Sequence, residues 1–158
     1  MTLTGFFLFL HVLGIVLWVG LAVALPFVTG PAARHESLEV TAFAYVIADR
    51  LTRTLGLAGM ILTLAGGIGL TMAHGYPWFQ PFPRHWLFQM QLLGIVAVAV
   101  GIAYQVPLSA RLAREARASA EAGQRTEAFA TYRKRHAIVG SVNGLLLLIV
   151  IVLATLKP

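Results

Sequence analysis

Four long and nearly uncharged apolar stretches constrain this chain more than any other feature. They cover about residues 3–28, 51–74, 85–110 and 136–156. Each has at least the roughly 20 residues that a helix needs to cross about 30 Å of hydrocarbon. Strands that cross a membrane are about half as long and alternate apolar with polar residues, a pattern absent here. The sequence therefore predicts an all-α integral membrane protein, a four-helix bundle forming a single domain over residues 1–158.

The composition excludes a soluble domain. The chain is 58% hydrophobic and only 11% charged, whereas charged residues make up about a quarter of a typical soluble domain. The lipid bilayer is therefore the first expected partner. The first stretch has no basic residue before it and is longer than the apolar region of a signal peptide, so we expect it to be retained. Because the chain has no cysteine, any metal must be held by histidine, methionine, carboxylate or backbone groups.

The basic residues indicate the orientation of the four spans. The side that holds the connections between spans 1 and 2 and between spans 3 and 4 carries ten of them, and the other side carries two, Arg84 and Lys157. Cytoplasmic loops are enriched in lysine and arginine. The bias predicts a multi-pass protein of the cytoplasmic membrane with both termini outside. The net charge of +6 is thus a signal of topology, and no nucleic-acid partner is expected. The ten inner basic residues are Arg34, Arg50, Arg53, Arg111, Arg114, Arg117, Arg125, Arg133, Lys134 and Arg135.

Local signals predict how the spans are connected on the inner side. Pro26, Gly30 and Pro31 are expected to end the first helix, and the apolar spacing in residues 36–49 predicts an amphipathic helix that merges into the second span.

The third span is expected to extend into the cytoplasm as far as Gly123, with a kink at Pro107. A short helix from Thr126 is predicted to lead back to the fourth span. On the outer side, the aromatic and proline residues of the loop 75–83 are expected to lie at the membrane surface.

Histidines are the polar residues that most need an explanation at membrane depth. His11 lies within the first span, His74 ends the second, and His85 opens the third, so all three fall in the outer half. His35 and His136 lie on the inner side. At 1.5 Å per residue, His11 lies about 10 Å inside the span, whereas His74 and His85 lie close to the ends of theirs. An ionisable group at the depth of His11 is costly and indicates a function.

Trp18 and Gly67 are the residues expected to surround His11. Trp18 follows His11 by seven residues and so shares its helix face. Gly67 belongs to a stripe of small residues on the second span, formed by Gly59, Thr63, Gly66, Gly67 and Gly69. Such a stripe lets either a neighbouring helix or a flat macrocycle approach the backbone closely.

Several segments together resemble a known family. They are His-Val-Leu-Gly-Ile-Val-Leu-Trp-Val-Gly at 11–20, Ala-Asp-Arg-Leu-Thr-Arg at 48–53, Val-Pro-Leu-Ser-Ala-Arg-Leu at 106–112 and Leu-Lys-Pro at 156–158. Over essentially its whole length the chain resembles the predicted four-span bacterial integral membrane family DUF2269. The first segment is also similar to the copper-resistance protein D-like domains and to the HemJ-like membrane protoporphyrinogen oxidase, in which a first-helix histidine is linked to haem. This similarity implies a role for His11 alone. The oxidase pattern also uses a lysine in a later span, which this chain lacks.

The leading hypothesis is a small membrane redox protein that binds haem b or a metal near the outer face. His11 would be one ligand and His74 or His85 the other, with Trp18 and Gly67 forming the pocket. Such a cofactor would exchange electrons with quinol or with an outer-side carrier. No catalytic residue set is recognisable, so the sequence indicates at most an oxidoreductase component.

Alternatives of other classes account for the same residues. The chain could be a non-catalytic accessory subunit that packs through its glycine-rich helix faces and its basic inner loops against a larger respiratory or transport complex, or against a second copy of itself. It could also handle copper, using the same histidines with Met72 or Met90. In the simplest interpretation the glycines only pack helices, His74 and His85 are solvated, and His11 makes an interhelical hydrogen bond.

Overall fold

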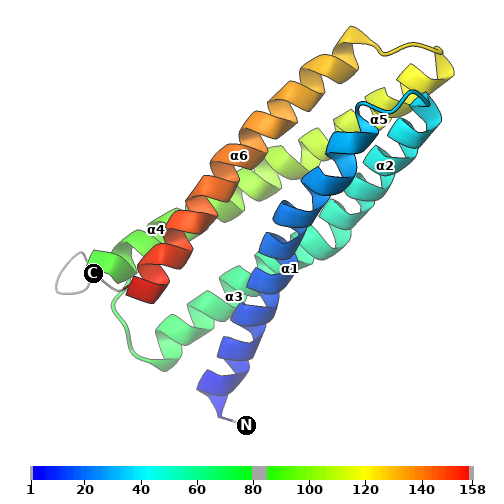
Figure 1. The fold of residues 1–158 in the computed structure, drawn as a ribbon. Helices are drawn as coiled ribbons and strands as arrows, with labels where there is room; N and C mark the ends of the chain where they lie inside the picture. The colour runs from blue at the N-terminus through cyan, green and yellow to red at the C-terminus, as the bar shows by residue number, and fades with distance from the viewer. Residues whose placement is uncertain (1, 80–84, 157–158) are drawn as a thin grey trace.

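The computed structural model describes residues 2–79 and 85–156, and all the regular structure in these ranges is helical. Figure 1 shows the helices as long rods lying side by side. In chain order the elements are α1 (Leu3–Ala32), α2 (Leu38–Leu51), the π-helical turn η1 (Thr52–Gly56), α3 (Leu57–Ala73), α4 (His85–Val100), the π-helical turn η2 (Gly101–Gln105), α5 (Val106–Glu121) and α6 (Glu127–Leu156).

These elements form four continuous rods that are long and apolar enough to cross a membrane. The rods are Leu3–Ala32, Leu38–Ala73, His85–Glu121 and Glu127–Leu156. The predicted all-α membrane bundle is therefore confirmed. Both termini lie at one end of the bundle, and the α1–α2 and α5–α6 connections lie at the other (Figure 1). Following the predicted orientation, we call these the outer end and the inner end.

The rods pack in pairs and bury two separate cores. In the membrane, α1 packs along α3 and α4 along α6, whereas α3 and α4 meet over only a short length. At the inner end α2 packs against α5. The membrane core consists of Trp18, Met60, Ala97, Val98 and Leu147. The inner core consists of Ala33, Ala42, Tyr45, Leu112, Ala116 and Phe129.

The prolines of the first rod do not end it, contrary to the sequence-based prediction. Helix α1 continues through Pro26 and Pro31 to Ala32. A proline removes one backbone donor, but a helix in lipid has no water with which its other backbone groups could bond, so leaving the helix would cost more. The hydroxyl of Thr29 donates to the carbonyl of Leu25 at 3.0 Å, and the amide of Ala33 closes the helix on the carbonyl of Thr29.

The inner connections follow the prediction in part. The amphipathic helix α2, capped by the hydroxyl of Ser37, merges through η1 into α3 as expected. Pro107 is the second residue of α5 and lies two residues after the end of the wide turn η2, which accommodates its missing N–H. Gly123 has a left-handed φ of 67° in the turn that follows α5. The separate short helix expected from Thr126 is wrong, because α6 runs without a break from Glu127 into the membrane.

Polar contacts tie the third rod to its neighbours. In the membrane, the Asn143 amide Nδ2 donates to Gln105 Oε1 at 3.1 Å and joins α6 to η2. Toward the outer end, the amide of Phe79 donates to Gln91 Oε1 at 2.9 Å and holds the start of the outer loop to α4. The rest of that loop, residues 80–84, lies outside the described residues, as does Lys157.

Candidate functional site

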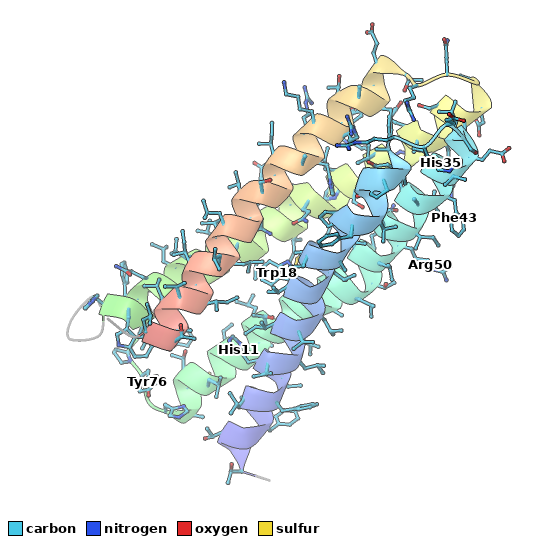
Figure 2. All side chains as sticks on the ribbon, in the orientation of Figure 1. His11, Trp18, His35, Phe43, Arg50 and Tyr76 are labelled. Carbon is cyan, nitrogen blue, oxygen red and sulfur yellow. The ribbon has the colours of Figure 1, made fainter. Side chains whose placement is uncertain are left out.

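His11 lies in the outer half of α1, with its ring turned toward α3. Its Nδ1 is 2.7 Å from the backbone carbonyl oxygen of Thr63. A carbonyl oxygen can only accept, so Nδ1 carries the proton and donates. In the neutral ring the lone pair then belongs to Nε2, which makes no hydrogen bond to any of the described residues. Figure 2 shows His11 beside α3. The site thus offers one oriented imidazole nitrogen at membrane depth.

Glycines of α3 make room for His11. A Cβ atom at Gly66 would lie 2.5 Å from the backbone nitrogen of His11 and 2.7 Å from its Cα. A Cβ atom at Gly67 would lie 3.2 Å from Cε1 of the ring. Farther out, the ring of Phe7 occupies the space beside Gly69, and toward the bundle centre Gly59 lies against the backbone of Trp18. The small-residue stripe is therefore filled by α1, and Gly67 contacts the imidazole itself.

Thr63 contributes a second polar group beside the imidazole. Its hydroxyl is buried and has no hydrogen-bond partner among the described residues, while its carbonyl accepts from His11. Gly14 of α1 lies so close that a Cβ atom there would collide with both the backbone nitrogen and the hydroxyl of Thr63. The missing side chain of Gly14 thus lets α1 and α3 approach closely about one turn inward from His11.

Trp18 lies deeper in the bundle than His11. Its side chain is only 3% exposed and packs in the membrane core with Met60 and Leu147. The seven residues that separate it from His11 correspond to about 10 Å along the helix. The two side chains share one face of α1, as their spacing predicts, but Trp18 fills the bundle centre.

The structure does not bring His74 and His85 to His11. His74 is the residue that caps α3; its Nδ1 lies 2.9 Å from the carbonyl of Leu70, and its ring stacks on Tyr76 with centroids 5.1 Å apart. It follows Gly67 by seven residues, which is about 10 Å farther along α3. His85 is exposed at the first turn of α4. Among the described residues no three histidine or carboxylate side chains are grouped to hold a metal ion.

The structure also contains a polar cluster at the inner end that the sequence did not predict. Arg53 donates to the Asp49 carboxylate through Nε, 3.0 Å from both oxygens, and through Nη2, 2.8 Å from Oδ2. Asp49 Oδ1 also accepts from the hydroxyl of Ser109 at 3.1 Å. Asp49 and Ser109 belong to two of the segments that carry the family resemblance, and this contact joins them. The spacing of four between Asp49 and Arg53 was a signal for a helical ion pair, but nothing in the sequence paired Asp49 with Ser109.

A cavity of about 230 Å³ lies beside this cluster. Every rod of the bundle contributes to its wall. The lining residues are Leu25, Pro26, Thr29 and Gly30 from α1, Tyr45, Ala48 and Thr52 from the second rod, Ser109 and Leu112 from α5, and Arg133, His136 and Ala137 from α6. The largest polar groups in the wall are Arg133 and His136, which share one face of α6.

Four apolar rods with lipid-exposed side chains along α1 and α6 define an integral membrane protein. The family described as "Predicted integral membrane protein (DUF2269)" matches residues 6–158. The chain therefore belongs to the DUF2269 family. No curated protein and no solved structure matches the chain.

Proposed function

We propose that this chain is a small redox protein of the bacterial inner membrane that binds haem b through Nε2 of His11. The hydrogen bond from Nδ1 of His11 to the Thr63 carbonyl, at 2.7 Å, carries the proposal. Histidines that bind metals commonly donate their second ring nitrogen to a carbonyl or carboxylate, which fixes the tautomer and raises the basicity of the ligating nitrogen. This bond leaves Nε2 as the nitrogen available to iron.

The surroundings of His11 support a rigid ligand. Its backbone lies against Gly66 and its ring against Gly67, so α3 restricts rotation of the imidazole about its side-chain bonds. The ring is half-buried in an apolar part of the bundle. A haem bound there would supply a one-electron centre near the outer face. His11 would orient that centre, and the apolar side chains of α1 and α3 would exclude water from one side of it.

The geometry supports one protein ligand from this set. Two histidines that bind one iron must lie at the same level, and His74 lies about 10 Å beyond the level of His11 on α3. Its own Nδ1 bond to the carbonyl of Leu70 and its stacking on Tyr76 hold it at the outer surface. Quinol or an outer-side carrier would be the electron partner of a centre at this depth.

The proposal is tested by optical spectra of the detergent-purified protein, oxidised and reduced with dithionite. The native protein is expected to show a sharp reduced α-band that is lost in His11→Ala. His74→Ala and His85→Ala are matched controls, each removing one imidazole from the outer half, and they are expected to keep the band. The melting temperature of each variant shows whether it has folded.

Two results would contradict the proposal. A featureless spectrum from folded native protein, also after incubation with haemin, would favour the accessory-subunit hypothesis, in which His11 serves only as an interhelical donor. If elemental analysis finds copper in the native protein and a smaller amount in His11→Ala, copper handling would be favoured instead.

A further inference from the structure

The inner cavity is the cavity of about 230 Å³ beside Asp49 and Ser109. The polar groups that line it differ in whether their hydrogen-bond donors are available to a ligand. The hydroxyl of Tyr45 donates to the carbonyl of Thr29 at 3.4 Å, and that of Thr52 donates to the carbonyl of Ala48 at 2.8 Å. Ser109 donates to Asp49. The hydroxyl protons on these walls are thus already used in bonds within the protein.

The unused donors are all on α6. No hydrogen bond or ion pair joins Arg133 or His136 to another described residue, although both line the cavity. A guanidinium has five N–H donors and a permanent positive charge, and a neutral imidazole has one donor. No carboxylate is among the lining residues, and the nearby Asp49 is paired with Arg53. The cavity therefore favours a ligand that is anionic and accepts hydrogen bonds.

The position of the opening indicates where such a ligand comes from. Pro26 and Gly30 of α1 and Arg133 and Ala137 of α6 are exposed, so they form the rim, while buried residues of the second rod and α5 form the floor. Helices α1 and α6 contact one another only weakly. A slot between two membrane-spanning helices opens sideways, into the bilayer. The apolar side chains of Leu25 and Leu112 continue the wall, as an acyl chain or glycerol backbone requires.

We propose that this cavity binds an anionic phospholipid of the inner leaflet, with its phosphate group beside Arg133 and His136. Basic pockets between transmembrane helices on the cytoplasmic side are suited to lipid headgroups. The inference rests on the inner cavity alone and does not depend on the proposed haem. It assigns a lipid to a defined place in the bundle, distinct from the general attraction of the inner basic residues to the membrane surface.

The test measures binding of individual lipids to the detergent-solubilised protein by native mass spectrometry. Phosphatidylglycerol, phosphatidylcholine and inorganic phosphate are the three probes. The native chain is expected to bind one phosphatidylglycerol in preference to phosphatidylcholine, and inorganic phosphate is not expected to compete. Arg133→Gln is expected to weaken this binding at least about tenfold, because a charge-assisted hydrogen bond is lost.

Two control variants make the test specific. Arg135→Gln removes the same charge two residues away on α6, at a position that does not line this cavity, and it is expected to bind as the native chain does. Gly30→Leu is expected to fill the cavity and abolish binding, whereas Gly20→Leu on the same helix is not. An added Cβ meets no atom within 4 Å at either glycine, so both variants are expected to fold.

The outcomes separate the alternatives. Undiminished binding by Arg133→Gln or by Gly30→Leu would overturn the proposal. Equal losses in Arg133→Gln and Arg135→Gln would also overturn it, because they would show that the lipid responds to surface charge alone. Full competition by inorganic phosphate would show an anion site without a lipid specificity and would overturn the assignment of the lipid.

Discussion

Replacing Gly66 by alanine is expected to lower the free energy of unfolding of the bundle by about 3 kcal/mol, the upper part of the usual range for overpacking. The new methyl group would lie 2.5 Å from the backbone nitrogen of His11 and 2.7 Å from its Cα. Backbone atoms cannot move aside as a flexible side chain can. The contact between α1 and α3 must therefore open at this point. That movement also breaks the bond between His11 and the Thr63 carbonyl.

The measurement is unfolding by a denaturing detergent added to mild micelles, followed by circular dichroism. Gly56→Ala is the matched control, since it lies on the same rod and is buried, but its added Cβ would meet no atom closer than 3.8 Å. This control is expected to unfold within about 0.5 kcal/mol of the native chain. If Gly66→Ala unfolds at the same detergent fraction as Gly56→Ala, the close approach of α1 and α3 described above is wrong.

Replacing Phe129 by alanine is expected to lower the free energy of unfolding by about 3 kcal/mol and to loosen the packing of the inner core. Phe129 is only 2% exposed, and its ring meets that of Tyr45 edge to face with centroids 5.3 Å apart. Truncating a buried phenylalanine removes apolar contacts and leaves a cavity. The edge-to-face pair adds about 0.5–1.5 kcal/mol to the contact. Because Phe129 joins α6 to α2, the loss is expected to fall on the inner end of the bundle.

Limited proteolysis between α5 and α6 reports on this region directly, and thermal unfolding reports on the whole bundle. The Phe129→Ala variant is expected to be cleaved faster there than the native chain and to melt at a lower temperature. Phe43→Ala is the matched control, because Phe43 lies on α2 and is 69% exposed. Equal cleavage rates in Phe129→Ala and Phe43→Ala would show that the inner core contributes nothing to the stability of this end.

The four membrane-spanning rods could be predicted from the sequence because few backbone conformations are stable in lipid. A backbone in hydrocarbon must satisfy its own hydrogen bonds, so long apolar runs become helices almost regardless of detail. The same principle explains the error at α1. In water, prolines such as Pro26 and Pro31 commonly end a helix, because the freed carbonyls can bond to solvent. Here α1 continues past both of them. The wide turns η1 and η2 have no such general signal and were not predicted.

The candidate site could be predicted only one helix at a time. Periodicity placed His11 and Trp18 on one face and Gly66 and Gly67 on another helix, and the structure packs these helices together. The depth of His74 was also readable from its place at the end of a span. What the sequence did not contain was the rotation of each rod about its axis and the pairing of rods. For this reason the contact between Ser109 and Asp49, and the cavity beside it, emerged only in three dimensions.

The rods also differ in hydrophobic length. Helix α1 has no charged side chain over its 30 residues, about 45 Å, whereas α6 is uncharged only after His136, over about 30 Å. A span longer than the hydrocarbon layer relieves the mismatch by tilting from the membrane normal. In one bilayer α1 is therefore expected to tilt more than α6, and Figure 1 shows the two helices diverging toward their outer ends. Membrane thickness thus acts on the surroundings of His11, because lipids with shorter or longer acyl chains will change the tilt of α1 relative to α6.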